Sequence, residues 1–244
     1  MKIGAIIQAR MGSTRLSGKV MKEIKGQSIL QHVIERVRQS KLVDEIVIAT
    51  TVHKQDNVIE NESLKHDVKV FRGSEDDVLS RYYYAAKENA IDLVIRITSD
   101  CPLIDPFVMD DVINSFLTSD YEIVSNAGSN LSQRTFPRGF DVEVFSFGIL
   151  EKAFSNAKET YQREHVTPYI YENSEKVFYY KNNIDYSKYR WTLDTEEDFE
   201  LISEVYDRLY KGEHNFYLNE IIELFNREPD LYQINVHIEQ KKLK

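Results

Sequence analysis

The amino-acid sequence predicts an α/β fold, with a mostly parallel central sheet and helices on both faces. Short apolar runs, such as residues 3–7 and 93–98, alternate with stretches of helical periodicity, which is typical of βαβ units. The expected strands are apolar almost throughout, which indicates burial on both faces. Of the 244 residues, 42% are hydrophobic and 29% are charged, so the chain can bury a large core. We expect residues 1–244 to form a single domain.

The first half of the chain carries the clearest alternation. Strands are expected at residues 2–7, 45–49, 68–71 and 93–98, and helices at 28–40, 56–65, 77–89 and 106–117. Ligands bind such sheets at the carboxyl ends of the strands. The loop that follows the first strand is therefore expected at the ligand-binding edge.

The pattern changes after residues 121–126. A polar, turn-rich segment at 128–137 is followed by expected elements in this order: strand 140–145, helix 147–157, helix 161–171 and strand 177–181. We interpret residues 128–189 as an excursion from the main sheet that covers the site or forms a dimer contact. The chain then returns with strand 189–193, helices 195–210 and 218–226, and a tail from residue 229.

Composition narrows the possible partners. The chain has 31 basic and 40 acidic residues and a formal net charge of −9, which disfavours nucleic acid as a partner, and its 15 tyrosines are too scattered for a base-stacking platform. No apolar run is long enough to span a membrane, and the chain enters a strand without a signal segment, so a cytoplasmic location is expected. The single cysteine, Cys101, excludes an internal disulfide and a cysteine zinc site.

The loop after the first strand has the composition of a phosphate-binding loop. Five residues separate Gly12 from Gly18, and Val20 follows Lys19, which excludes a Walker A motif; two glycines are also too few for a dinucleotide fingerprint. Small residues would let the backbone approach a ligand, and the cations would neutralise an anion. From composition alone, a solvated cationic turn is an equally good interpretation. The loop residues concerned are Arg10, Gly12, Ser13, Arg15, Gly18 and Lys19.

The order of these residues, Arg-x-Gly-Ser-x-Arg-Leu-x-Gly-Lys from Arg10 to Lys19, resembles the opening motif of the nucleotidyltransferases that make activated sugars. It is most similar to the acylneuraminate and 3-deoxy-manno-octulosonate cytidylyltransferases, and especially to their SpsF branch, although Ser17 stands where many relatives have Pro. The resemblance implies a nucleotide-diphospho-sugar transferase, Rossmann-like fold. It also implies Mg²⁺-dependent transfer of a nucleoside monophosphate from a nucleoside triphosphate, with CTP favoured, to a sugar or sugar acid in cell-surface or spore-coat polysaccharide biosynthesis.

Two aspartates are candidate metal ligands. Asp100 ends an expected buried strand, where an unpaired carboxylate is costly; capping a turn is the alternative role. Asp194 precedes an expected helix in which Thr195 is the N-cap and acidic residues occupy the first turn. The resemblance implies that Asp100 and Asp194 hold Mg²⁺. Magnesium typically binds one or two carboxylates together with substrate phosphates.

The remaining site residues follow from the same resemblance. Arg10, Arg15 and Lys19 would stabilise the departing pyrophosphate, and nucleotide contacts are expected from Ala9, Gly12, Ser13, Arg72, Ser74, Asp77 and Arg81. Asp77 and Arg81 have the i, i+4 spacing of a helix-surface ion pair, and we treat that alternative as equally good.

For the acceptor sugar, the candidates are Arg134, Arg138, Asp141 and Glu143, since arginine suits a carboxylate or phosphate. His165 is interpreted as a half-buried helix residue. A homodimer is also expected, because relatives are commonly dimers and large aromatic residues are frequent at interfaces. Those of the excursion are Phe136, Phe140, Tyr161, Tyr169, Tyr171, Phe178, Tyr179 and Tyr180.

Two other functions remain alternatives. Metal-dependent glycosyltransferases use a similar sheet but usually carry Asp-x-Asp, which this sequence lacks. A non-catalytic nucleotide-binding protein with the same fold is the second alternative.

Overall fold

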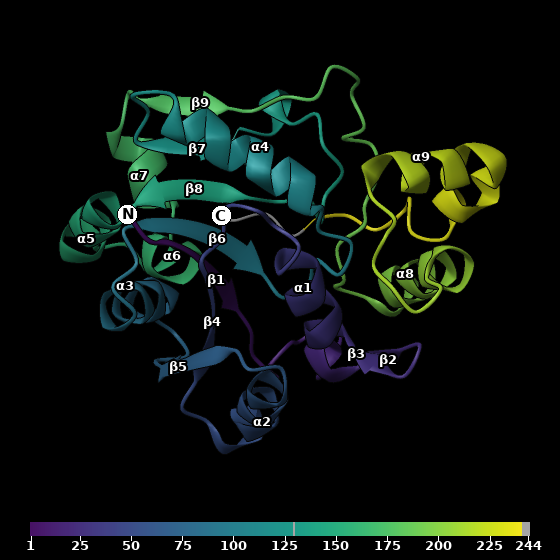
Figure 1. Cartoon of the computed structure of the whole chain (residues 1–244), viewed down its shortest axis with the longest axis horizontal. Coiled ribbons are helices and arrows are strands. Elements are labelled where there is room, and N and C mark those ends of the chain that lie inside the picture. Colours follow the sequence, from purple (N-terminus) through teal and green to yellow (C-terminus); the bar gives the residue numbers. More distant parts are fainter. Residues whose placement is uncertain (129, 241–244) are drawn as a thin grey trace.

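A seven-stranded sheet runs through the computed structural model, which describes residues 1–128 and 130–240 (Figure 1). The strand order is β5-β4-β1-β6-β8-β7-β9. The parallel part consists of β1 (Ile3–Gln8), β4 (Glu45–Thr51), β5 (Lys69–Gly73) and β6 (Leu93–Thr98). Beyond β6, β8 (Glu143–Ser146) runs antiparallel to both β6 and β7 (Ile123–Ser125), and β9 (Val177–Tyr179) is parallel to β7. The prediction of a mostly parallel sheet is confirmed.

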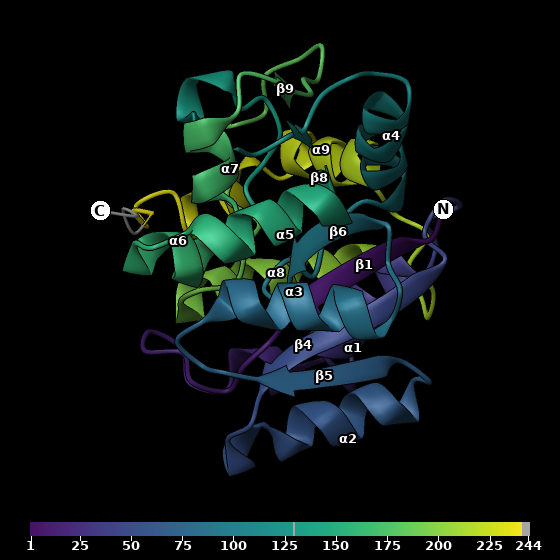
Figure 2. The same ribbon diagram turned by 90° about the vertical axis from the view of Figure 1, so that its left-hand side faces the viewer.

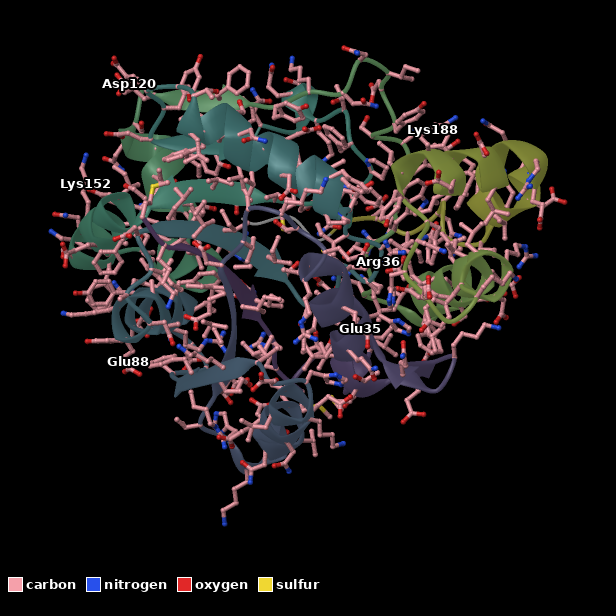
Figure 3. The ribbon with its side chains drawn as sticks, in the orientation of Figure 1. Glu35, Arg36, Glu88, Asp120, Lys152 and Lys188 are labelled. Carbon is pink, nitrogen blue, oxygen red and sulfur yellow. The ribbon has the colours of Figure 1, made fainter. Side chains whose placement is uncertain are left out.

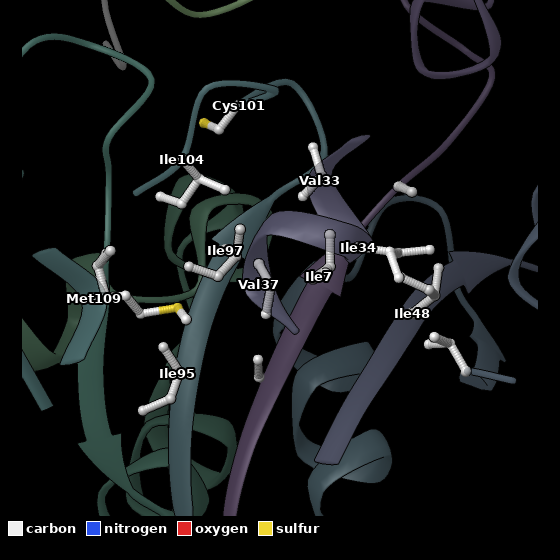
Figure 4. Packing of buried hydrophobic residues seen from close by; sticks show 14 of the residues in the cluster. Ile7, Val33, Ile34, Val37, Ile48, Ile95, Ile97, Cys101, Ile104 and Met109 are labelled. Carbon is white, nitrogen blue, oxygen red and sulfur yellow. The ribbon is translucent and has the colours of Figure 1, made fainter. Parts of the chain in front are cut away.

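Helices cover both faces of the sheet, as Figure 2 shows from the side. Successive side chains of β1 point to opposite faces. Ile3, Ala5 and Ile7 pack under α1 (Ile29–Val37), α2 (Asn57–Lys65) and α4 (Pro106–Leu117). Ile6 points to the other face, under α3 (Val78–Glu88), α5 (Phe147–Asn156), α6 (Thr160–His165) and α7 (Pro168–Asn173). Figure 4 shows the first of these two packed layers.

Local sequence signals set where several helices begin. A side-chain oxygen at the N-cap accepts a hydrogen bond from an amide of the first turn, which satisfies a group that the helix itself cannot pair. The residues that do this are Ser28, Asp77, Asp105, Ser146 and Thr195. In α4, Pro106 also occupies the first turn, where its missing N–H costs nothing.

Two C-terminal helices, α8 (Glu196–Leu209) and α9 (Leu218–Arg227), form a third packed cluster with Phe140 and Trp191. They are followed by the 3₁₀ helix η4 (Pro229–Gln233). Arg36 of α1 lies inside the molecule toward this cluster, whereas Glu88, Asp120, Lys152 and Lys188 lie at the periphery (Figure 3). Arg36 Nη1 donates to the carbonyl of Phe216 at 3.0 Å, so the buried charge ties α1 to the C-terminal helices.

The main differences from prediction lie in the second half. The expected helix 161–171 is two helices, α6 and α7, because Val166 has a φ of +72° and Pro168 starts α7. The expected strand 189–193 forms only an isolated bridge between Arg138 and Arg190. The strands of segment 128–189, β8 and β9, extend the main sheet itself.

Several short elements had no sequence prediction. They are η1 (Lys19–Met21), β2 (Glu23–Ile24), β3 (Gln27–Ser28), η2 (Lys54–Asp56) and η3 (Leu131–Gln133). Across the described residues, no helix combines the length and apolar character needed to cross a membrane.

Candidate active site

The loop between β1 and η1 folds back on itself at the carboxyl end of the sheet. The carbonyl of Met11 accepts the amides of Ser13, at 2.8 Å, and Gly18, at 3.1 Å. Gly18 has a φ of +64°, which glycine adopts without steric cost. This turn brings Lys19, the first residue of η1, beneath the loop.

Lys19 lies between the two predicted metal-binding carboxylates. Its Nζ donates to Asp100 Oδ2 at 2.9 Å and to Asp194 Oδ1 at 2.8 Å, and also to the carbonyl of Leu193 at 2.7 Å. Burial alone would lower the pKa of Lys19, but the two carboxylates outweigh burial and raise it. Residues 81 and 175 positions away along the chain from Lys19 thus meet at one ammonium group.

The neighbours of Asp100 stabilise its charged form. Burial by itself would raise its pKa, but Lys19 and the Thr98 hydroxyl, 2.5 Å from Oδ1, bring the pKa below its usual value. The backbone carbonyl of Asp100 also accepts the Leu193 amide at 2.8 Å. The end of β6 is thereby joined directly to the segment that carries Asp194.

Asp194 faces two arginines in addition to Lys19. Its Oδ2 lies 2.9 Å from Arg15 Nη2 and 3.0 Å from Arg190 Nη2. The side chain of Arg15 is 36% exposed, whereas that of Arg190 is 7% exposed. Arg15 and Lys19 therefore reach the carboxylates from the loop, and Arg190 reaches Asp194 from within the protein.

Two carboxylates suit a divalent cation that completes its coordination with phosphate oxygens and water. The side chains of Asp100 and Asp194 are 24% and 11% exposed, so both are reachable from the ligand edge. No cluster of three or more His, Cys, Asp or Glu residues suited to a metal occurs in the described part of the chain. Two partly exposed carboxylates are a donor set that fits Mg²⁺ bound together with nucleotide phosphates.

Arg10 lies at the rim of the loop, apart from the other two cations. Its Nη1 is 3.2 Å from Glu75 Oε1, and a Cβ on Gly12 would lie 3.1 Å from the same oxygen. The Ala9 amide donates to the carbonyl of Ala49 at 3.2 Å, and Ser13 Oγ accepts the Leu16 amide at 3.4 Å. The loop is thus braced against the ends of β4 and β5.

Arg81 is a buried cation with unused donors. It is 2% exposed, yet its Nε and Nη1 have no hydrogen-bond partner among the described residues. Burial lowers its pKa, and so does the nearby charge of Arg10. The predicted Asp77–Arg81 ion pair is not formed, because Asp77 pairs with Arg163 at 2.5 and 3.0 Å.

The other predicted base contacts have structural roles here. Arg72 donates to the carbonyls of Thr51 and His53, both at 2.9 Å, and pairs with Glu60 at 2.7 Å. It therefore fastens the connection from β4 to α2. Ser74 is exposed, and its hydroxyl accepts the Asp77 amide at 3.2 Å.

The candidates for binding the acceptor lie near β8, which is on the opposite side of β6 from β1 and its loop. Asp141 pairs with both Nη atoms of Arg134, at 2.6 and 3.1 Å. Burial raises the pKa of the Cys101 thiol, and the nearby charges of Asp100 and Asp141 raise it further. Arg138 is half-buried, and burial lowers its pKa, as do Arg134 and Arg190.

Glu143 is fully engaged within the protein. It is 5% exposed, pairs with Arg96 at 2.5 Å, and accepts the hydroxyls of Thr167 and Tyr171 at 3.0 and 2.7 Å. This residue joins β6, β8 and α7. Contact with a sugar would require Glu143 to give up these partners.

His165 is half-buried at the end of α6, as expected.

Comparison with known proteins decides the family. A family model described as Cytidylyltransferase matches residues 4–243. The chain belongs to this family. The resemblance seen in the motifs is confirmed, and the chain is an enzyme that uses CTP rather than a glycosyltransferase or a non-catalytic protein.

Relatives of this cytidylyltransferase include proteins that match almost its full length. A Methanocaldococcus jannaschii protein described as uncharacterized is 42% identical and covers 99% of the chain and 97% of its own length. The spore coat polysaccharide biosynthesis protein SpsF of Bacillus subtilis is 33% identical, covering 92% of the chain and 94% of SpsF. The 3-deoxy-manno-octulosonate cytidylyltransferase of Geotalea daltonii is 34% identical over 47% of the chain and 44% of its own length.

Solved structures agree with this assignment. A cytidylyltransferase from Leptospira borgpetersenii is 40% identical, with a TM-score of 0.89 and coverage of 99% of both chains. CMP:2-keto-3-deoxy-manno-octonic acid synthetase, solved with CTP, is 17% identical, with a TM-score of 0.67 over 85% of this chain and 99% of its own. A Mycobacterium tuberculosis protein solved with manganese is 12% identical, with a TM-score of 0.57 over 84% of this chain and 99% of its own. The last two comparisons show a shared fold.

Sequence reasoning left Arg190 and Asp198 of this cytidylyltransferase without a role in the site. Asp198 is one of the acidic residues expected in the first turn of the helix after Thr195, where negative charge complements the helix dipole. In the structure it is fully buried and pairs with Arg190, at 2.9 Å from both Nε and Nη2. The only signal in the sequence is their spacing from Asp194, four residues on each side.

Proposed function

We propose that this cytidylyltransferase transfers the CMP group of CTP to a sugar or sugar acid, with Mg²⁺ and with release of pyrophosphate, in cell-surface or spore-coat polysaccharide biosynthesis. The observation that carries the proposal is the meeting of Asp100 and Asp194 at Lys19, directly below the cationic loop. The relatives named for polysaccharide biosynthesis and for 3-deoxy-manno-octulosonate support the type of acceptor.

Each group has a distinct role in this proposal. Asp100 and Asp194 hold Mg²⁺, which when bound polarises the α-phosphate for attack by the acceptor oxygen. Lys19 and Arg15 exchange their carboxylate partners for the β- and γ-phosphates and stabilise the negative charge that leaves with pyrophosphate. Arg10, at the rim of the loop, adds a third positive charge that stabilises the departing pyrophosphate. Positioning and electrostatics supply most of the rate enhancement.

The nucleotide and acceptor occupy opposite sides of these carboxylates. Arg81 offers its two unpaired donor nitrogens, Nε and Nη1, to the nucleotide. A buried donor without a partner is costly, so a carbonyl acceptor on the ligand would be bound strongly. Arg138 is the candidate for a carboxylate or phosphate on the acceptor, because Arg134 is already paired with Asp141.

Pyrophosphate release tests the proposal. Protein is mixed with Mg²⁺ and one of CTP, UTP, GTP, ATP or dTTP, together with a panel of sugars and sugar acids. We expect release with CTP, dependent on both acceptor and metal, and abolished by EDTA. Equal release with every base would contradict the CTP assignment. Release without any metal would remove Mg²⁺ from the proposal.

A further inference from the structure

The C-terminal segment returns to the active site after leaving the packed helices. Figure 1 shows the yellow end of the chain turning back from α9 toward the sheet. Asn235 is 2% exposed, although the residue that follows it, Val236, is 45% exposed. Gln240, which is five residues after Asn235, places its Oε1 2.6 Å from Arg190 Nη1. This part of the chain therefore contacts the arginine that binds Asp194.

Asn235 uses its amide group to join two parts of the site. Its Nδ2 donates to the backbone carbonyl of Arg190 and to Asp198 Oδ1, both at 2.8 Å. An amide nitrogen has two hydrogens to donate, so both are used. Replacement of Asn235 leaves a buried acceptor on each of these residues without this donor.

Asp198 fixes the backbone that carries Asp194. Its Oδ2 accepts the amide of Asp194 at 2.9 Å and that of Thr195 at 3.1 Å, and Arg190 donates one bond to each of the two carboxylate oxygens. With Asn235, these donors fill the acceptor sites of a carboxylate. Because Asp198 is fully buried, it cannot exchange a lost donor for bulk water.

Arg190 transmits this arrangement to the Asp194 side chain. Its Nη2 bridges Asp198 Oδ2, at 2.9 Å, and Asp194 Oδ2, at 3.0 Å. The pairing with Asp198 offsets the charge of Arg190, so Asp194 keeps negative charge for another cation. If the pair came apart, Arg190 would bind Asp194 alone and compete with a metal for it.

We propose that the C-terminal segment 235–240 positions Asp194 for metal binding, with Asn235 and Gln240 acting through Asp198 and Arg190. The inference rests on the proposed function, because it takes Asp194 as a metal ligand. Asn235, Gln240, Asp198 and Arg190 are positioning residues, since none of them needs to touch substrate. Hydrogen-bond partners behind a metal ligand typically change metal affinity or activity about 10- to 100-fold when they are removed.

The test measures the gain in CTP affinity that a metal produces. Calorimetry gives the Kd of CTP with Mn²⁺ and with EDTA, and the ratio of the two is the metal-dependent gain. Asn235→Ala is compared with Val236→Ala, its exposed neighbour. A chain ending at Ile234 is compared with a chain ending at Gln240, which keeps both contacts.

We expect Asn235→Ala and the chain ending at Ile234 to reduce the metal-dependent gain about 10-fold or more. Their CTP affinity in EDTA should stay within about twofold, and both controls should match the wild type. A purely structural role predicts equal losses with and without Mn²⁺ and a lower Tm, which would overturn the inference. An unchanged gain in both variants would overturn it as well. No gain in the wild type would instead refute the metal role of Asp194, and with it this inference.

Discussion

Asp100 and Asp194 are the residues on which the proposed chemistry depends most directly. Replacement of either by Asn keeps the size and an acceptor oxygen for Lys19 but removes the charge that a metal needs. We expect each variant to lower the rate of pyrophosphate release by about 100-fold or more. Steady-state assays at several Mg²⁺ concentrations measure this, and circular dichroism checks the fold.

The two variants are informative in different ways. Asp194 has three cationic neighbours, Lys19, Arg15 and Arg190, so its charge also holds the loop in place. Near-normal activity in Asp194→Asn would remove this residue from the metal site. Unfolding of either variant would show that the carboxylates mainly stabilise the fold.

Lys19 makes a separate prediction about the triphosphate. Its ammonium is bound to two carboxylates in the structure, and the proposed function requires it to move to the β- and γ-phosphates. Lys19→Ala should therefore weaken CTP binding at least tenfold more than CMP binding, because charge-assisted hydrogen bonds to the leaving phosphates are lost. Calorimetric titration of both nucleotides measures the difference. Equal losses for CTP and CMP would mean that Lys19 acts on the base or only on folding.

At the residue scale, the strand end and the motifs predict that carboxylates and cations meet, and the structure brings these side chains together. Asp100 and Lys19 meet because they follow the parallel strands β6 and β1, whose carboxyl ends share one edge, whereas Asp194 reaches them from a segment that forms only an isolated bridge. The partners of Glu143 and Arg72 could not be predicted. Both residues lie in motifs that suit ligand binding, but Arg96, Thr167 and Glu60 engage them from other elements.

At the scale of elements, the boundaries in the first half follow from apolar periodicity and N-caps. The errors arise where tertiary contacts override local pattern. Residues 189–193 are apolar enough for a strand, but Gly139, with a φ of +98°, passes so close to Trp191 that a Cβ would lie 2.5 Å from its carbonyl oxygen. That approach permits the single bridge from Arg138 to Arg190 and no ladder.

The contact of α1 with the C-terminal helices contains a buried histidine pair. His32 Nδ1 lies 2.8 Å from His214 Nε2, and His214 Nδ1 lies 3.1 Å from Glu35 Oε2. Burial, with a smaller contribution from the charge of Arg36, lowers the pKa of His32 to about 4 despite its bond to the Ile24 carbonyl. Burial, Arg36 and His32 lower the pKa of His214 to about 3.

This pair should make the fold sensitive to acid. Below about pH 6.5 the histidines of the unfolded chain bind protons, whereas the buried histidines of the native state do not. The free energy of unfolding therefore falls as the pH drops toward 4. The slope is up to about 1.4 kcal/mol per pH unit for each histidine. Urea unfolding from pH 7.5 to 4.5 measures it. His214→Gln should flatten the dependence, whereas the exposed His237→Gln should not; a wild type with constant stability over this range would contradict the assignment.

At the scale of the whole molecule, the sheet is more continuous than the sequence indicates. Segment 128–189 supplies β8 beside β6 and β9 beside β7. The antiparallel pairing of β6 with β8 depends on long-range register, which apolar patterning does not specify.

Of the aromatic residues expected at a dimer contact, Phe136 and Phe140 are buried in the chain's own core, at 3% and 0% exposure. These two residues are therefore unavailable to a partner.

The same segment leaves other aromatic and aliphatic surface open to a second copy. Tyr169, Tyr171, Phe178 and Tyr180 are half-buried, Ile184 is 59% exposed, and β9 is the last strand of the sheet in the described part of the chain. An edge strand with nearby apolar side chains is a favourable place for chain association. We therefore predict a homodimer whose contact lies mainly in residues 128–189.

Light scattering at micromolar concentration should give the mass of a dimer, and a monomer mass would contradict the prediction. Ile184→Glu should shift the protein toward monomer, because a charge placed in an interface core costs binding free energy unless it is paired. Val58→Glu is the matched control, since Val58 is 44% exposed on α2, among the helices of the first half. Because the two substitutions add the same charge, net charge cannot explain a difference between them. Dissociation by Val58→Glu but not by Ile184→Glu would place the interface on those helices instead.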